Sequence, residues 1–393
     1  MDLKIQIYDR TLAKINAKIL ADKKLEAPRH YLGMSQIGEE CERKLFYSFR
    51  CCEIDEQNII GTKAANDGHR QELEMAKHLQ SLPFIELYTE DSVTPGEQIG
   101  YELLLGHFRG HLDGIIRGIV EAPKTWHVWE HKSKDKSMFN KLKKIRQENG
   151  EKLSLKMWNI IYYAQAIIYM HSSKLSRHYM TVSTPGGRDA ISIRTDYNQK
   201  YAEMLIDKAQ RIIFENNYLP PGTSDKKEVF ACKFCPYIDI CHDKQFPLVH
   251  CKTCRYREPV KNGENFCHFK KEDIDKKYLH MRCNNHIYNP ALIQAKLVDQ
   301  QLDCCVYQLE NKTYLANCSL SGLPEMNEEH KDVLIYTSTE LRDNIQFLPN
   351  LEAKKAIEVC QAVSGTFENS EKKAWDKRED FGADSLIKTL EGE

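Results

Sequence analysis

The pattern of apolar and polar positions predicts an α/β fold for the first 245 residues. Amphipathic stretches with helical spacing flank a series of shorter stretches that alternate as strands do. Helices are expected over about 1–30, 62–81, 153–173 and 198–216. Strands are expected over 84–91, 101–119 (as two strands), 126–133, 178–183 and 191–197, the last two as a hairpin. A sheet with helices before and after it is the architecture that this order favours.

A cysteine-rich segment over 246–290 separates this block from a second one. From residue 291 the pattern restarts, and it predicts a smaller α+β region that extends to residue 393. A helix is expected in PALIQAKLVDQQL, and strands in CCVYQL, TYLANC and VLIYTS. The charged C-terminal stretch is expected to be helical, with a loosely ordered tail from about residue 370.

Composition narrows the classes of protein that fit. The formal net charge is −1 over 393 residues, so any nucleic-acid site must be a local patch rather than a general property of the surface. The longest apolar run, over 157–170, is too short to span a bilayer, and the N-terminus lacks the apolar core of a signal peptide. These features predict a cytoplasmic protein. Its 14 cysteines should then be reduced, so clusters among them suggest metal binding rather than disulfides.

Two short motifs carry candidate chemistry, GHLDG with Asp113 and WEHKS with Glu130 and Lys132. On a strand, Glu130 and Lys132 share one face and His131 lies on the other. This arrangement is either a simple salt bridge or part of an active site. If Asp113 joins them, two carboxylates repel each other unless a divalent cation neutralises them, and Mg²⁺ or Mn²⁺ suits such oxygen ligands. The Lys132 ammonium would then stabilise developing negative charge.

With two further elements, these motifs resemble the PD-(D/E)XK nuclease superfamily. The resemblance is to its RecB-like branch, which includes the CRISPR-associated iron–sulfur exonucleases. The further elements are His69 in GHRQELE and the pair Gln165 and Tyr169 in YYAQAIIYM, which are spaced i, i+4 on one helix face. The resemblance covers about residues 30–245. The proline that precedes the aspartate in the superfamily's name is absent here.

The resemblance implies a restriction-endonuclease-like core, a mixed central sheet flanked by helices, within a nuclease domain over 1–245. It also implies that His69, Asp113 and Glu130 hold Mg²⁺ or Mn²⁺, with the backbone carbonyl of His131 as a further ligand. Lys132 would be catalytic, and Glu72, one turn after His69, would have an auxiliary role. The implied catalytic set is Asp113, Glu130, Lys132, Gln165 and Tyr169.

A basic segment follows Lys132. Such a run could follow a phosphate backbone, with Met138 and Phe139 available to contact bases, or it could be an ordinary solvated loop. Its candidate DNA-binding residues are Lys134, Lys136, Lys141, Lys143, Lys144 and Arg146.

The cysteines fall into two sets. The resemblance implies that one early cysteine and three at the end of the nuclease domain hold a four-iron four-sulfur (4Fe-4S) cluster, and an all-thiolate site suits iron–sulfur or zinc. Here these are Cys41, Cys232, Cys235 and Cys241. The second set predicts a structural zinc site, with His268 or His286 as possible substitutes. Its members are Cys251, Cys254, Cys267 and Cys283.

A rival grouping of the cysteines also has zinc-binding spacing. Cys232 and Cys235 with Cys251 and Cys254 match a zinc ribbon. That grouping leaves Cys241, Cys267 and Cys283 without partners and Cys41 unexplained.

The function expected from these features is that of a metal-dependent DNA nuclease, an exonuclease acting on DNA ends or single strands. It would work in recombination, repair, phage replication or spacer processing. The sequence has no Walker A loop, so unwinding would come from a helicase, recombinase or other DNA-processing partner. Two alternatives stay open: a structure-specific or restriction-like endonuclease, and a non-catalytic nucleic-acid-binding protein organised by metal clusters.

Overall fold

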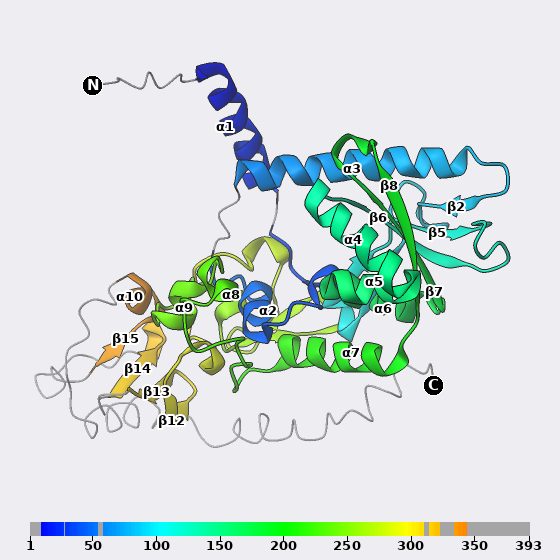
Figure 1. Ribbon diagram of the computed structural model, residues 1–393. Coiled ribbons are helices and arrows are strands. Elements are labelled where there is room, and N and C mark those ends of the chain that lie inside the picture. Colours follow the sequence, from blue (N-terminus) through cyan, green and yellow to red (C-terminus); the bar gives the residue numbers. More distant parts are fainter. Residues whose placement is uncertain (1–8, 27, 54–57, 310–313, 323–333, 344–393) are drawn as a thin grey trace, which may run out of the picture. The chain divides into compact units, whose positions relative to one another are not determined.

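The computed structural model describes residues 9–26, 28–53, 58–309, 314–322 and 334–343 (Figure 1). The chain forms two compact units, over residues 1–281 and 282–393. The cysteine-rich segment expected at 246–290 therefore belongs, up to residue 281, to the same unit as the central sheet. Within the described residues, no helix is long and apolar enough to cross a membrane.

A five-stranded sheet forms the centre of the first unit, in the order β2-β5-β6-β7-β8. The β6–β7 pair is parallel and the other pairs are antiparallel, so the sheet is mixed, as predicted. The strands are β2 (Glu86–Tyr88), β5 (Gly114–Arg117), β6 (His127–Ser133), β7 (Arg177–Ser183) and β8 (Ala190–Asp196). The predicted hairpin over 178–197 is confirmed as the β7–β8 pair.

Helices lie on both faces of this sheet, which confirms the predicted α/β fold class. Ala76 of α3 packs with Trp129 of β6 in one apolar cluster. Glu130 points to the opposite face, where Gln165 of α6 contacts it. The helices of this unit are α1 (Arg10–Lys24), α2 (Glu42–Phe49), α3 (Ile59–Gln80), α4 (Lys136–Asn149), α5 (Glu151–Trp158), α6 (Ile160–Ser173), α7 (Gln199–Phe214), α8 (Phe230–Lys233) and α9 (Ile238–His242).

The single helix predicted over 153–173 is wrong, because Asn159 divides it into α5 and α6. Asn159 has an extended backbone (φ −153°, ψ 107°), and its side chain accepts hydrogen bonds from the amides of Ile161 and Tyr162 at 3.0 and 3.1 Å. An asparagine that caps a helix in this way starts a new one rather than continuing the old.

Two small sheets complete the first unit. One has the order β1-β4-β3, and the other β11-β10-β9. The prediction of two strands over 101–119 is wrong, since the region forms three. A turn at Leu104 and Leu105, both with positive φ, separates β3 from β4, and β5 begins at Gly114 in another sheet. The strands of the small sheets are β1 (Leu32–Gly33), β3 (Gly100–Leu103), β4 (Phe108–His111), β9 (Arg257–Pro259), β10 (Asn265–Cys267) and β11 (Glu272–Asp273).

The second unit contains a four-stranded sheet in the order β12-β13-β14-β15 and one short α-helix among its described residues. The helix predicted in PALIQAKLVDQQL is wrong. Only Pro290–Leu292 is helical, as one 3₁₀ turn, and Lys296–Gln301 form a strand whose alternate residues are exposed. The elements are β12 (Lys296–Gln301), β13 (Cys304–Gln308), β14 (Tyr314–Cys318), β15 (Ile335–Tyr336) and α10 (Ser338–Asp343). The predicted charged C-terminal helix and tail lie outside the described residues.

Short 3₁₀ turns connect many of these elements. In chain order they are η1 (Met34–Gln36), η2 (Leu104–Gly106), η3 (Pro185–Gly187), η4 (Cys251–Thr253), η5 (Lys261–Gly263), η6 (Lys276–Tyr278), η7 (Pro290–Leu292) and η8 (Leu320–Gly322).

Candidate active site

The β5–β6 pairing brings two of the predicted carboxylates together. Gly114 pairs with Trp129, so Asp113, one residue earlier, lies beside Glu130, one residue later. The carboxylate of Asp113 accepts a hydrogen bond from the backbone amide of His131 at 2.8 Å. Burial nevertheless raises the pKa of Asp113, although Lys132 and this hydrogen bond oppose the shift. A buried carboxyl with a raised pKa is short of positive charge.

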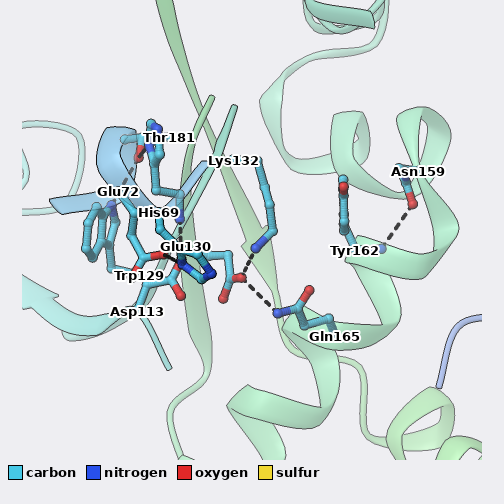
Figure 2. A network of polar contacts seen from close by, with 11 residues as sticks. His69, Glu72, Asp113, Trp129, Glu130, Lys132, Asn159, Tyr162, Gln165 and Thr181 are labelled. Atoms are coloured by element: carbon cyan, nitrogen blue, oxygen red, sulfur yellow. Dashed lines mark hydrogen bonds and ion pairs between the residues drawn. The ribbon is translucent and has the colours of Figure 1, made fainter. Parts of the chain in front are cut away.

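Glu130 is almost fully buried on the face of β6 that α6 covers (Figure 2). One carboxylate oxygen, Oε1, forms an ion pair with Lys132 and accepts a hydrogen bond from the Gln165 amide at 2.8 Å. The other oxygen, Oε2, is buried and has no hydrogen-bond partner. Burial, together with repulsion from Asp113, raises the pKa of Glu130 to about 8. Glu130 therefore has an oxygen free to accept a further positive group.

Helix α3 adds a third carboxyl, Glu72, and the predicted histidine, His69. Burial, followed by repulsion from Asp113, raises the pKa of Glu72 to about 7. The Nδ1 atom of His69 lies 3.8 Å from Oε2 of Glu72, and the His69 side chain is 79% exposed. We call Glu72, Asp113 and Glu130 the acidic cluster.

Lys132 is the cation beside the acidic cluster. Burial alone would lower its pKa, but Glu130 and Asp113 outweigh that effect and raise it above the ordinary value. Lys132 is therefore protonated at neutral pH. One ammonium faces three carboxyls, so the cluster carries more potential negative charge than this lysine offsets.

The predicted pair on α6 lies at this site. The Tyr169 side chain forms a hydrogen bond with Gln165, which in turn donates to Glu130. The Tyr169 ring passes over Gly110 of β4, where a Cβ atom would lie 2.6 Å from ring atom Cε1. Gly110 thus leaves the space that the ring fills. Burial, followed by the Glu130 charge, raises the pKa of Tyr169, so its hydroxyl is protonated at neutral pH.

His131 anchors the other face of β6, as the alternation predicts. Its ring contacts the hydroxyl of Thr181 at 2.9 Å and that of Ser183 at 3.1 Å. Burial, then Lys132, lowers its pKa to about 4, so the ring is neutral at physiological pH. The ligand role predicted for its backbone carbonyl stays a prediction.

The basic segment is largely helix α4. Its Lys136 forms an ion pair with Asp189, and Lys144 lies 3.9 Å from Glu148. Phe139 is only 5% exposed and packs into the core, so the expectation that it contacts bases is wrong. The DNA-binding role of the basic residues stays a prediction.

Sequence reasoning missed Tyr162, which belongs to the same site. Figure 2 shows Tyr162 and Gln165 on one helix, on the side that faces Lys132 and Glu130. The Nζ atom of Lys132 is 5.6 Å from the centroid of the Tyr162 ring. The signal was present, because 162, 165 and 169 share one helix face.

The first cysteine set converges on one pocket. Cys41, Cys232, Cys235 and Cys241 all line it. Burial and repulsion from Cys41 and Cys241 raise the pKa of both Cys232 and Cys235. Two cations flank the pocket, Arg43, whose Nη1 donates to Sγ of Cys241 at 3.5 Å, and Lys44.

The second cysteine set begins at η4 of the first unit. Cys251 and Cys254 lie at this turn, and Cys267 lies at the end of β10, paired with Arg257 of β9. Cys283 belongs to the second unit. The zinc site predicted from these four cysteines stays a prediction.

As the side chains are arranged, no three His, Cys, Asp or Glu residues in the described part of the chain form a group that could hold a metal ion. At the acidic cluster, Lys132 lies against Glu130, while His69 is at the surface. A divalent cation still fits the chemistry of these donors, because Glu130 Oε2 is unsatisfied and three carboxyls share one ammonium. A 4Fe-4S cluster binds each thiolate to a different iron, so its cysteines can be farther apart than the ligands of one ion.

Comparisons with known proteins found solved structures only. No family model and no curated protein matches the chain. The crystal structure of SSO0001 is 16% identical over 60% of this chain and 98% of that chain, with a TM-score of 0.36. An alkaline exonuclease, LHK-Exo from Laribacter hongkongensis, is 11% identical over 50% of this chain and 90% of that chain, with a TM-score of 0.32. The structure of LHK-Exo in complex with dAMP is 11% identical over 51% of this chain and 90% of that chain, with a TM-score of 0.31.

Proposed function

We propose that this protein is a metal-dependent DNA nuclease that hydrolyses phosphodiester bonds at the acidic cluster. The observation that carries the proposal is the buried Glu130 oxygen without a partner, in a cluster of three carboxyls and one lysine. Such a cluster is costly to a fold unless a cation joins it. The ordered sequence set of His69, Asp113, Glu130-x-Lys132 and Gln165-x₃-Tyr169 supports the same reaction.

We assign each residue of the site a role in this reaction. Asp113 and Glu130, with His69 and Glu72 beside them, would hold Mg²⁺ or Mn²⁺, which when bound polarises the phosphate and activates water. The Lys132 ammonium would stabilise the negative charge that develops on the phosphate oxygens as water adds and the P–O bond breaks. Gln165 fixes the orientation of the Glu130 carboxylate, and the His131 amide fixes that of Asp113.

We further propose an exonuclease that acts on DNA ends or single strands, in recombination, repair, phage replication or spacer processing. A helicase or recombinase would supply any unwinding. The test incubates purified protein and Mn²⁺ with linear and circular single-stranded DNA. An exonuclease degrades only the linear form, and cleavage of the circle indicates an endonuclease instead.

The site assignment is tested with Lys132→Ala. We expect its cleavage rate to fall at least about 100-fold, as when other transition-state charge stabilisers are removed. The control is Lys152→Ala, which removes a surface ion pair with Asp196 and should cleave like the wild type. Equal cleavage by the wild type and Lys132→Ala overturns the assignment. If the folded wild type leaves all DNA intact, the protein is a non-catalytic binding protein.

The proposal includes two structural cofactors, a 4Fe-4S cluster on Cys41, Cys232, Cys235 and Cys241, and zinc on Cys251, Cys254, Cys267 and Cys283. Iron and zinc analysis of Cys232→Ser tests the partition. If there are two sites, the variant loses iron and the visible absorption of thiolate-to-iron charge transfer, and it keeps zinc. The rival zinc ribbon predicts that the variant loses zinc.

A further inference from the structure

A row of three side chains leads along β6 from the acidic cluster to the surface. Residues 130, 132 and 134 alternate onto the same face, and the Lys134 amide donates to the Ser183 carbonyl at 2.8 Å, so the pairing with β7 continues past Ser133. The side chain of Glu130 is 2% exposed and that of Lys132 is 22% exposed. Lys134 is also partly exposed. The row therefore provides a graded path from the buried carboxylate to solvent.

A second row on α6 faces the first. It consists of Tyr169, Gln165 and Tyr162, of which the first two are buried and Tyr162 is partly exposed. Gln165 contacts Glu130, and the Tyr162 ring lies 5.6 Å from Lys132 Nζ and 4.9 Å from Lys134 Nζ. Because α6 begins at the Asn159 cap, Tyr162 is in its first turn and marks the outer end of this row.

Lys134 differs from the other lysines nearby in what it contacts. Lys136 is paired with Asp189, and Lys132 with Glu130. Within the described part of the chain, Lys134 forms no ion pair, and its ammonium lies over the Tyr162 ring. A partly exposed ammonium held over an aromatic ring, with no carboxylate to neutralise it, is available to a phosphate.

We propose that Tyr162 and Lys134 bind one unpaired nucleotide next to the scissile phosphate, its base against the Tyr162 ring and its phosphate on the Lys134 ammonium. Single-strand binding sites combine aromatic rings with cations in this way. A base inside a duplex is already stacked on its neighbours and cannot use the ring. The substrate class is therefore a single strand or a frayed end. This inference deepens the proposed function and rests on it for the cleavage that follows binding.

A binding experiment tests the inference without cleavage. Full-length protein in EDTA is titrated with a single-stranded oligonucleotide that carries 2-aminopurine at the 5′ or the 3′ terminal position. We expect the wild type to quench the fluorescence on binding, as stacking does. Tyr162→Phe should keep the quenching, whereas Tyr162→Ala should lose it and raise the dissociation constant about 5- to 100-fold. Lys134→Ala should reduce the slope of log Kd against the logarithm of the salt concentration by about 0.7.

The chain offers a matched control pair. The Nζ atom of Lys277 lies 4.8 Å from the ring of Tyr278, which is 50% exposed. Tyr278→Ala and Lys277→Ala remove the same groups at another place and should change neither quenching nor salt dependence.

An abasic substrate separates stacking from a structural role of Tyr162. With Mn²⁺, Tyr162→Ala should raise KM for the normal single strand with little change in kcat. When the nucleotide at the quenched end is abasic, wild type and Tyr162→Ala should have the same KM. A penalty that persists on the abasic strand overturns the inference, since Tyr162 then acts by supporting Lys132. Unchanged quenching in Tyr162→Ala also overturns the inference.

The outcomes also distinguish the inference from the proposed function. If the wild type does not cleave but shows Tyr162-dependent quenching, the nuclease proposal fails and the nucleotide site stands. If the wild type cleaves and Tyr162→Ala is unchanged in both assays, the nucleotide site fails and the nuclease proposal stands.

Discussion

The first unit buries two groups of like charge, one acidic and one basic. The acidic cluster is Glu72, Asp113 and Glu130. The basic cluster is Arg50, Lys252 and Arg257, which are at most 5% exposed. Burial lowers the pKa of Lys252 to about 8 and the pKa values of both arginines as well, and repulsion from Arg257 adds to the shifts of Lys252 and Arg50. Each cluster thus has an excess of one sign of charge, and burial alone does not say which of them is functional.

The two clusters differ in what surrounds them. The cations contact permanent parts of the protein. Arg50 donates to the carbonyls of Ile212 and Glu215 at 2.7 and 2.5 Å, and Lys252 donates to that of His30 at 3.3 Å. Phe49 lies under both Lys252 and Arg257. From the acidic cluster, Lys132, Lys134 and Tyr162 continue toward the surface.

Thiols provide a further contrast. The charged form of Cys51 would raise the pKa of Lys252, and those of Cys51, Cys251 and Cys254 would raise that of Arg257. Thiolates that hold the proposed zinc would therefore supply negative charge to the basic cluster from within the fold. For the acidic cluster, the proposed divalent cation would come from solution. We infer that the basic cluster serves stability, whereas the proposed catalysis belongs to the acidic cluster.

Of the variants that test the contrast between the acidic and basic clusters, Glu130→Gln is expected to have the largest effect. The amide keeps the shape of the side chain but cannot bind a cation as a carboxylate does, and it spares the folded state the cost of protonating a buried carboxyl beside Asp113 and Glu72. We expect DNA cleavage to fall at least about 100-fold and the melting temperature in EDTA to rise. Nuclease assays and thermal unfolding measure the two effects.

The pH dependence of stability gives the same test a second readout. Glu130 has a higher pKa in the folded than in the unfolded state, so the folded state binds more protons between about pH 4.5 and 8. Stability in EDTA should therefore fall as pH rises through this window, and less so in Glu130→Gln. The control Glu151→Gln loses a partner of Arg194 and should retain activity. A Glu130→Gln variant that cleaves normally would contradict the catalytic role.

A smaller effect, on stability alone, is expected for Lys252→Met. Lys252 has a lower pKa in the folded than in the unfolded state, so the unfolded state binds more protons between about pH 8 and 10.5. Wild-type stability should rise with pH across this window, and the variant should lose that rise while cleaving DNA like the wild type. Unfolding in urea at several pH values measures it. The proposed separation of roles fails if Lys252→Met reduces cleavage of DNA.

The two clusters also differ in whether the sequence could predict them. The acidic site could be predicted because strand alternation pairs Glu130 with Lys132, helix spacing pairs Gln165 with Tyr169, and the family resemblance joins the two pairs. The basic cluster could not, since Arg50 is about 200 residues from Lys252 and Arg257 and each resembles a surface residue in its own segment. Only the tertiary fold brings them together.

Local capping and pairing explain the other failures. Apolar spacing runs continuously across Asn159, so the pattern concealed the break that places Tyr162 in the first turn of α6. In the second unit, PALIQAKLVDQQL has helical spacing, but pairing with β13 makes Lys296–Gln301 a strand. Tertiary hydrogen bonds outweighed local propensity there.

The smallest effect is expected for Tyr169→Phe. The Tyr169 hydroxyl contacts Gln165, which holds Glu130, so its loss leaves the acidic cluster complete and loosens the orientation of one carboxylate. We expect kcat to fall a few-fold, with KM unchanged, because the ring still fills the space over Gly110. Tyr163→Phe is the matched control. Tyr163 lies on the same helix as Tyr169, but its ring stacks on that of Tyr201 in α7, with 5.2 Å between the ring centroids. If kcat falls as far in Tyr169→Phe as in Glu130→Gln, the hydroxyl acts on the reacting phosphate itself rather than through Gln165.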